Sequence, residues 1–250
     1  MDKGVEAANK MFLLNRAHGW LALKVKILQD ILNSPEKHLP YLKSLNDETT
    51  LLYFKEGVKL DIICSTVHLC EIFAIYLINF RERKENFVEK LLNYKISEVK
   101  DFYRGIGKRN INYITSCFLW PPFSSIENSF RKKEMLTSSQ LLKAELKRIA
   151  KFYRANVDIY NSYKHGLRAF PFVSTDAEGN LFGCIANFTD KNDCRKIKIG
   201  VFQTKECIEI CNFINEVLNG LFESYEQLSK NKDAYTVTIW SKRQQSSAQS

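Results

Sequence analysis

This sequence lacks most of the short motifs by which an activity can be recognised directly. It contains no GxSxG or HExxH segment and no acidic cluster at metal-ligand spacing. The segment YRGIGKRN at 103–110 combines glycines with basic residues, but no Ser or Thr follows its Gly-Lys pair, so we interpret it as a basic turn. No motif therefore points to an α/β-hydrolase, an HExxH zinc peptidase or a P-loop nucleotidase, and we expect no cofactor and no metal.

The sequence also lacks any CxxC pair. An odd number of cysteines, seven in 250 residues, argues against a disulfide framework and is typical of reduced, buried thiols in a cytoplasmic protein. Cys207 and Cys211 lie one helical turn apart, but no histidine or second cysteine pair stands at zinc-ligand spacing. Buried thiols are the preferred interpretation, and zinc binding is the alternative.

A long uninterrupted apolar segment is missing as well. The first twelve residues, MDKGVEAANKMF, do not have the charged-then-apolar layout of a secretory signal, and we expect no targeting segment there. The most apolar stretch begins at Leu60, but Asp61, His68 and Glu71 interrupt it and leave only Ile72–Ile78 unbroken. We expect a buried core helix that does not cross a membrane.

What the sequence has in excess is positive charge. Lys and Arg number 37 against 28 Asp and Glu, a net charge of +9. Residues 131–154 alone hold eight basic and two acidic residues. Such a balance favours an anionic partner such as RNA or a nucleotide, while a solvated lysine-rich surface is the alternative. The candidate nucleic-acid-binding residues are Lys143, Lys147, Arg148 and Lys151.

Hydrophobic periodicity divides the chain into a helical part and a mixed part, with no internal repeat. Helices are predicted over 5–33, 43–55, 58–83, 86–106 and 139–164, with a loop at 121–138 whose Thr/Ser run at 137–139 can cap the next helix. Strands are predicted over 169–173, 181–188, 196–203 and 234–240, with a helix over 204–229.

The predicted fold class is therefore α+β, mainly α. A helical bundle spans residues 1–166, and a small antiparallel meander with one packed C-terminal helix spans 167–241. We expect both parts to form one unit, because the helix that ends at Gly166 continues directly into a strand. Residues 242–250 are predicted to be a disordered tail.

The candidate site lies at the end of helix 139–164. Arg154, Asp158, Asn161 and His165 follow one another at steps of four, three and four, so a helix places them on one stripe, with Lys164 beside the last. Histidine can act as a general base near neutral pH, the amide can orient it, and Arg154 or Lys164 can hold a phosphate. This set could cleave RNA without a metal.

Each of these residues also has a structural interpretation. A Lys and a His in the last turn of a helix interact favourably with the helix dipole, and Arg154 with Asp158 is an ordinary i,i+4 pair. His68 and Glu71, one turn apart on an apolar helix, are either satisfied core residues or supporting members of a site shared with the stripe. A non-catalytic helical scaffold that binds proteins is the alternative function.

From Val58 to Arg168 the chain resembles the HEPN superfamily, and is similar to bacterial proteins that share its KDFY segment and its FYRANVDIYNSYKHG segment, with the pattern YNxYKHG. The resemblance implies an up-down helical bundle, often dimeric, that acts as an RNA-cleaving toxin or defence effector through an Arg and a His on its last helix. His165 would match the histidine, and Asn161 the polar residue near the arginine. No Arg occupies 158–160, so Arg154 or Lys164 would take the arginine's place.

Overall fold

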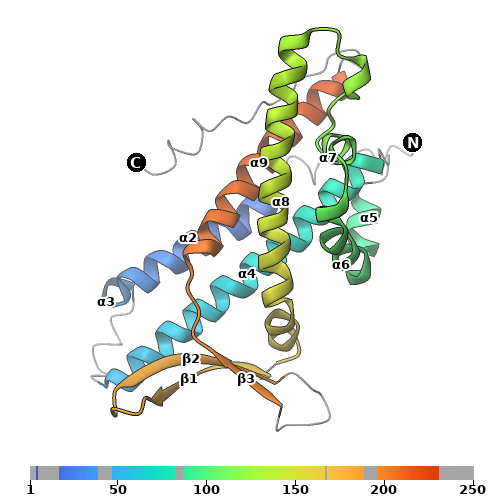
Figure 1. The fold of residues 1–250 in the computed structure, drawn as a ribbon. Coiled ribbons are helices and arrows are strands. Elements are labelled where there is room, and N and C mark those ends of the chain that lie inside the picture. The colour runs from blue at the N-terminus through green and yellow to red at the C-terminus, as the bar shows by residue number, and fades with distance from the viewer. Residues whose placement is uncertain are drawn as a thin grey trace. The chain divides into compact units, whose positions relative to one another are not determined.

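The computed structural model describes Gly4 and residues 17–38, 47–82, 87–166, 168–188 and 196–230. The predicted fold class is confirmed: the chain is mainly helical with one small antiparallel sheet (Figure 1). In chain order the elements are α2 (Ala17–Asn33), α3 (Pro35–His38), α4 (Glu48–Glu82), α5 (Phe87–Asn93), α6 (Ile96–Gly105), η2 (Ile106–Lys108), α7 (Ile111–Cys117), η3 (Phe123–Ser125), α8 (Ser129–Lys164), β1 (Ala169–Thr175), β2 (Leu181–Phe188), β3 (Ile197–Gly200) and α9 (Lys205–Lys230).

The chain forms two compact units that are interleaved in sequence. The first unit comprises 1–17, 70–153 and 215–250, and the second comprises 18–69 and 154–214. Each of the long helices α4, α8 and α9 therefore contributes one part to each unit. The sheet, the end of α8 and the first part of α4 belong to the second unit, which contains the candidate catalytic residues.

The core of the first unit is built from aromatic side chains. Tyr76 and Phe80 of α4 lie against Phe222 of α9, with ring centroids 5.1 and 6.1 Å apart. Tyr103 of α6 lies 4.8 Å from Tyr153 of α8, and its hydroxyl donates to the Cys70 carbonyl at 2.6 Å. Aromatic pairs of this kind add about 0.5–1.5 kcal/mol each to the stabilisation from buried area.

In the second unit, α2 and the start of α9 are joined by side-chain contacts, and α4 is buried among its neighbours. Thr204, directly before α9, donates its hydroxyl to Gln29 Oε1 of α2 at 2.8 Å. Thr66 of α4 lies 3.5 Å from the Cys211 sulfur of α9. Val25 and Ile62 are fully buried here. These contacts join the start of α9 to both α2 and α4.

The sheet is a meander with strand order β1-β2-β3, all antiparallel, as predicted. Phe172 pairs with Cys184, and Ala186 pairs with Ile199. In the β1–β2 turn, Gly179 has φ 87°, a conformation that glycine adopts without strain. One face of the sheet lies against the start of α4, where the Gly57 position is 3.8 Å from the Pro171 ring (Figure 1).

Two predicted helix boundaries were wrong. Helix α8 begins at Ser129, within the predicted loop, and the carboxamide of Asn128 accepts from the Arg131 amide at 3.1 Å. The Thr/Ser run at 137–139 lies inside the helix, where the Ser139 hydroxyl donates to the Met135 carbonyl at 2.6 Å. The Thr137 and Ser139 hydroxyls donate to backbone carbonyls one turn earlier in the same helix, so the run does not act as a cap.

Helix α4 begins ten residues before the predicted start at 58 and runs through Gly57 without a break. Asp47 precedes it and accepts hydrogen bonds from the amides of Thr49 and Thr50 at 3.1 and 3.3 Å, which caps the helix. By length and composition α4 could cross a membrane, but 83% of its most apolar 18-residue window is buried inside the protein. This is the burial expected of a core helix.

Some sequence predictions lie outside the described residues. They are residues 5–16 of the first predicted helix, the turn at 189–195, the strand over 234–240 and the tail at 242–250. The segment 86–106 forms two helices, α5 and α6, separated at Tyr94 and Lys95.

Candidate functional site

Helix α8 ends where the sequence predicted, at a glycine. Gly166 has φ 66°, in the left-handed region, and its amide donates to the Tyr163 carbonyl at 3.0 Å. The His165 amide donates to the Asn161 carbonyl at 3.3 Å. Backbone groups therefore close this turn, and the chain then enters β1 at Ala169.

The predicted stripe lies on the surface of the second unit. Arg154, Asp158, Lys164 and His165 are exposed, and Asn161 is half-buried. Among the described residues, the side chains of Asn161 and His165 have no hydrogen-bond partner. The imidazole is thus open to solvent and to ligands, and its orientation is not held by a second side chain of the described residues.

Lys164 is connected to His68, one of the residues predicted to support the site. The Lys164 ammonium lies 3.9 Å from the ring centroid of Tyr160, and that ring stacks on the His68 imidazole with centroids 6.0 Å apart. Tyr160 is almost fully buried and His68 is half-buried. The end of α8 and the middle of α4 therefore meet through the Tyr160 ring.

Positive charge surrounds this histidine. Burial lowers the pKa of His68 below its usual 6.5, and the charges of Lys164 and Lys24 lower it further. His68 is therefore neutral at pH 7 and can accept a proton or a hydrogen bond. Lys24 comes from α2, and nothing in the sequence indicated its approach, because no local spacing relates residue 24 to residue 68.

Asp61 of α4 is the acidic group of this cluster. It accepts a hydrogen bond from the Tyr163 hydroxyl at 2.6 Å, and this bond, with burial, raises the pKa of Tyr163 to about 12. Cys64 lies one turn further along α4, where burial raises the pKa of its thiol to about 12. Both groups are protonated at neutral pH, so neither Tyr163 nor Cys64 is an activated nucleophile.

Glu71, the second predicted supporting residue, has its partners in the first unit. Its carboxylate is fully buried and accepts from the Tyr153 hydroxyl at 3.3 Å and the Tyr94 hydroxyl at 3.5 Å. Burial and the adjacent carboxylate raise the pKa of Tyr153 well above its usual 10, so this phenol remains a donor. Glu71 is thus a hydrogen-bonded core residue.

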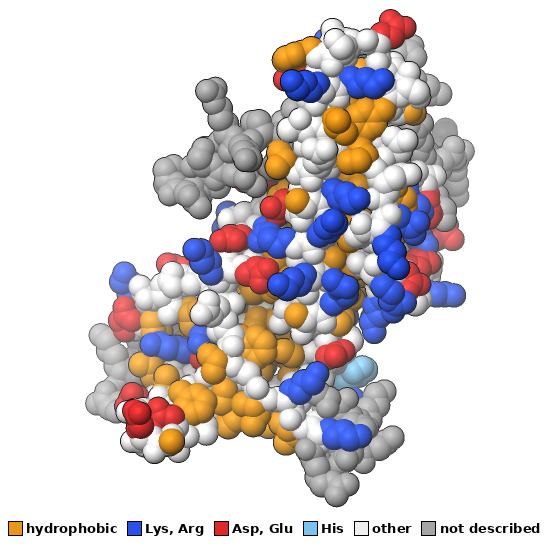
Figure 2. Space-filling view, in the orientation of Figure 1, with side chains coloured by type: hydrophobic (Ala, Val, Ile, Leu, Met, Phe, Trp, Pro, Cys, Tyr) orange, Lys and Arg blue, Asp and Glu red, His pale blue; other side chains and the backbone are white. Residues whose placement is uncertain are grey.

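The four predicted nucleic-acid-binding residues lie on the part of α8 in the first unit. Lys147 and Lys151 are exposed. Lys143 donates to the Arg109 carbonyl at 2.6 Å, and Arg148 forms an ion pair with Glu145 at 2.8 Å. Figure 2 shows Lys and Arg side chains gathered along this helix. Lys143 and Arg148 therefore already have partners within the protein, whereas Lys147 and Lys151 are exposed and accessible to an anion.

Further cations of the first unit surround the Tyr113 ring. The guanidinium carbons of Arg81 and Arg109 lie 4.8 and 4.6 Å from its centroid. Arg109 belongs to the segment that the sequence analysis interpreted as a basic turn, and the structure places it directly before α7. Sequence reasoning did not find Arg81, because it is contributed by the end of α4.

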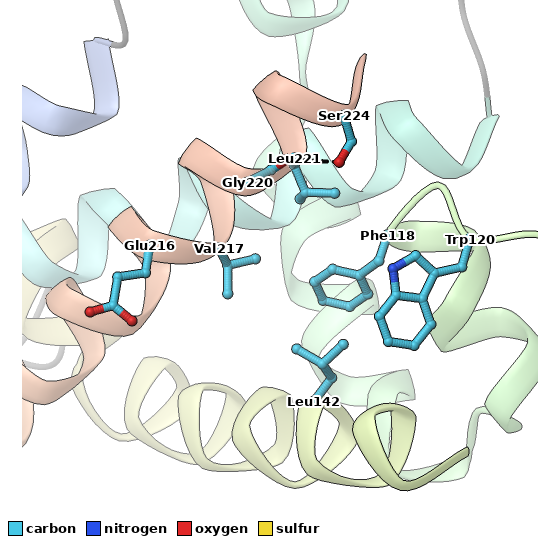
Figure 3. A pocket seen from close by; sticks show the side chains of 8 residues that line it. All are labelled: Phe118, Trp120, Leu142, Glu216, Val217, Gly220, Leu221 and Ser224. Atoms are coloured by element: carbon cyan, nitrogen blue, oxygen red, sulfur yellow. Dashed lines mark hydrogen bonds between the residues drawn. The ribbon is translucent and has the colours of Figure 1, made fainter. Parts of the chain in front are cut away.

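A small pocket in the first unit is not a substrate site. It lies between α7, α8 and α9 and is lined by mostly apolar side chains, among them Phe118, Trp120 and Leu142 (Figure 3). Its cavity volume of about 20 Å³ holds about one water molecule. The Ser224 hydroxyl at its rim donates to the Gly220 carbonyl at 2.9 Å, as Figure 3 shows.

Metal chemistry has no candidate ligand set in the described part of the chain, since no three His, Cys, Asp or Glu side chains come together there. No protein-family model matches the sequence, and neither a curated protein nor a solved structure matches it. The second unit offers the features from which a function can be inferred: the exposed imidazole of His165, the neutral His68 with the charges of Lys164 and Lys24 acting on it, and an exposed helix end.

Proposed function

We propose that this chain is an HEPN-like intracellular RNA- or nucleotide-binding protein of a defence or toxin system. Its second unit would bind a phosphate of the RNA or nucleotide at the end of α8, and His165 would be the base in a metal-independent cleavage of RNA. The observation that supports this most is the way α8 ends. Backbone hydrogen bonds close the turn at Gly166, whereas the side chains of Asn161 and His165 take no part in it among the described residues.

This observation bears directly on the scaffold alternative. If Asn161 and His165 served only to fix the helix-to-strand junction, their side chains should bond the free carbonyls of the last turn or lie buried against the sheet. Instead His165 is exposed and Asn161 is half-buried. Open polar side chains next to an exposed lysine are the arrangement that a ligand site needs.

Lys164, Lys24 and His68 would supply the anion-binding part of the site. Lys164 lies over the Tyr160 ring that stacks on His68, and the charges of Lys164 of α8 and Lys24 of α2 both lower the pKa of that imidazole, which supports a site for an anion there. A phosphate placed there receives charge-assisted hydrogen bonds from the ammonium groups. Because His68 is neutral at pH 7, it adds polarity without a third charge.

In the proposed reaction, the His165 imidazole removes the proton from a ribose 2′-hydroxyl. The 2′-oxygen attacks the adjacent phosphorus while the bond to the 5′-oxygen breaks. The leaving oxygen takes a proton from water, and the resulting hydroxide takes the proton from the His165 imidazolium. The products are a 2′,3′-cyclic phosphate and a free 5′-hydroxyl. Lys164 stabilises the negative charge that develops on the phosphate oxygens.

The test combines RNA binding and cleavage. Wild-type protein, His165→Ala, Lys164→Ala and the control Lys37→Ala, an exposed lysine on α3, are incubated with mixed cellular RNA in EDTA and analysed on a gel. Binding to a labelled RNA is measured by fluorescence anisotropy over a series of salt concentrations. Circular dichroism establishes that each variant is folded.

We expect His165→Ala to abolish cleavage while binding is retained. Lys164→Ala should weaken binding and reduce the slope of log affinity against log salt by about one, as for loss of one phosphate contact. Lys37→Ala should leave both properties unchanged. Wild-type protein that neither binds nor cleaves RNA, or a folded His165→Ala variant that retains both properties in full, would refute the proposal and favour the scaffold.

A further inference from the structure

The two faces of the sheet differ in what covers them. Pro171 and Gly183 are on the face that lies against α4: Pro171 contacts the Gly57 position, and a Cβ atom on Gly183 would collide with the Glu56 side chain. Side chains alternate along a strand, and paired residues point to the same side. The opposite face, here called the outer face, therefore carries Phe170, Phe172, Phe182, Phe188, Ile197 and Ile199.

The outer face is apolar and partly exposed: Cys184 and Ala186 on its middle strand are buried, and the exposed side chains lie around them. Ile197 and Ile199 are 43% and 61% exposed, Phe182 is 36% exposed, and the other three phenylalanines are half-buried. The rings of Phe170 on β1 and Phe188 on the adjacent strand β2 are neighbours, with centroids 5.9 Å apart. Figure 2 shows hydrophobic side chains gathered over the sheet. Exposed apolar patches of this kind commonly mark a binding surface.

Charge indicates which partner fits this surface. The end of the sheet where β1 begins is basic: Lys164 and Arg168 precede β1 next to His165, and Lys196 precedes β3. Lys198, which pairs with Asn187, lies on the opposite face. The Phe188 amide donates to the Arg168 carbonyl at 2.8 Å, which places Arg168 at the edge of the outer face. The opposite end, the β1–β2 turn, carries Asp176 and Glu178. A polyanion would therefore lie toward the His165 end.

We propose that the outer face is a stacking platform for the bases of single-stranded RNA, and that it directs the strand toward His165. This inference rests on the proposed RNA binding and adds the substrate class. Bases stack on aromatic rings irrespective of sequence, and each stacked base adds appreciable affinity. In a duplex the bases are stacked on one another and are not available to the sheet. The basic end holds the phosphates that follow the stacked bases.

The test separates stacking from general apolar contact. Binding of a labelled 12-nucleotide single-stranded RNA and of the same sequence as a duplex is measured by fluorescence anisotropy. The variants are Phe170→Leu and Phe188→Leu, which retain apolar volume but lose the aromatic ring. The control is Leu181→Ala, an exposed leucine on the face opposite the outer face. Thermal melting of each variant establishes that the fold is retained.

We expect the wild type to prefer the single strand and each Phe→Leu variant to bind it at least about fivefold more weakly, in line with the loss of one stacked base. Leu181→Ala should bind as the wild type does. Equal affinity for single strand and duplex, or Phe→Leu variants that bind normally, would overturn the platform. If the platform were overturned in this way but Lys164→Ala still bound RNA more weakly than the wild type, the proposed RNA binding at the end of α8 would stand without the platform.

The converse result is also informative. If the Phe→Leu variants lose affinity but Lys164→Ala does not, the platform holds and the proposed anion site at the end of α8 fails. The competing occupant of the outer face is a second copy of the chain. A wild-type dimer that Ile199→Asp converts to a monomer by light scattering, with unchanged RNA affinity, would assign the outer face to dimerisation and overturn the platform.

Discussion

Replacing Gly166 by alanine should destabilise the protein through the backbone alone. Gly166 has φ 66°, and a Cβ atom placed on it would meet no atom within 4 Å. The substitution therefore creates no collision and removes no side-chain contact. The expected cost is the strain of an L-residue in the left-handed region, about 1–2 kcal/mol, reduced by the smaller conformational freedom of alanine in the unfolded chain.

The net expectation is a loss of about 1 kcal/mol in the free energy of unfolding, which corresponds to about 2–4 °C in melting temperature for a chain of this size. Gly179, with φ 87° and equally open surroundings, should behave in the same way. Gly107 is the matched control, because a Cβ there also meets no atom within 4 Å but its φ lies outside the left-handed region. Gly107→Ala should be neutral or slightly stabilising.

The measurement is urea unfolding followed by circular dichroism for the wild type and the three alanine variants. Gly166→Asn is a useful fourth variant, since asparagine tolerates the left-handed conformation better than alanine and should recover part of the loss. Equal stability of Gly166→Ala and Gly107→Ala, within about 0.3 kcal/mol, would show that the end of α8 does not have the conformation described.

Three further predictions concern buried groups. Tyr153→Phe removes a hydrogen bond to the buried Glu71 carboxylate and should lower the free energy of unfolding by about 1–3 kcal/mol, whereas Tyr53→Phe, at a 52% exposed position, should change nothing measurable by urea unfolding. The pKa of His68 is lowered in the folded state, so the unfolded chain binds this proton at higher pH, and the free energy of unfolding falls as the pH drops below about 6.5. In His68→Phe, the difference in the free energy of unfolding between pH 7 and pH 5, measured by urea unfolding, should be smaller than in the wild type. An unchanged difference would contradict this. Burial raises the pKa of Cys64 to about 12, so iodoacetamide at pH 8 should label it only after unfolding, as read by peptide mass spectrometry, and rapid native labelling would contradict its burial.

The parts of the fold that local chemistry determines were predictable. Gly166 was identified as the end of α8 because only glycine enters the left-handed region without cost, and the structure confirms it. The start of the same helix was wrong, because a Thr/Ser run can either cap a helix or bond back to its own carbonyls. Burial of Ser138 and Ser139 beside Met135 selects the second arrangement.

The candidate site divides in the same way. The stripe of Arg154, Asp158 and His165 follows from helical spacing and is exposed as a set. The partners of His68 do not follow from spacing. Tyr160 and Lys164 come from α8 and Lys24 from α2, and only the tertiary fold brings these helices to α4.

By itself, the sequence determined the fold class, the three strands of the sheet, the burial of α4, the alternation of side chains in the sheet and the end of α8, because each depends on residues a few positions apart. It did not determine where α4 and α8 begin. The tertiary structure decided which neighbours those elements acquired. It gave Glu71 its two tyrosines, placed two lysines near His68, and covered one sheet face with α4 while leaving the phenylalanines of the other open. Contacts between residues distant in sequence depend on the packing of whole elements, and no local pattern encodes them.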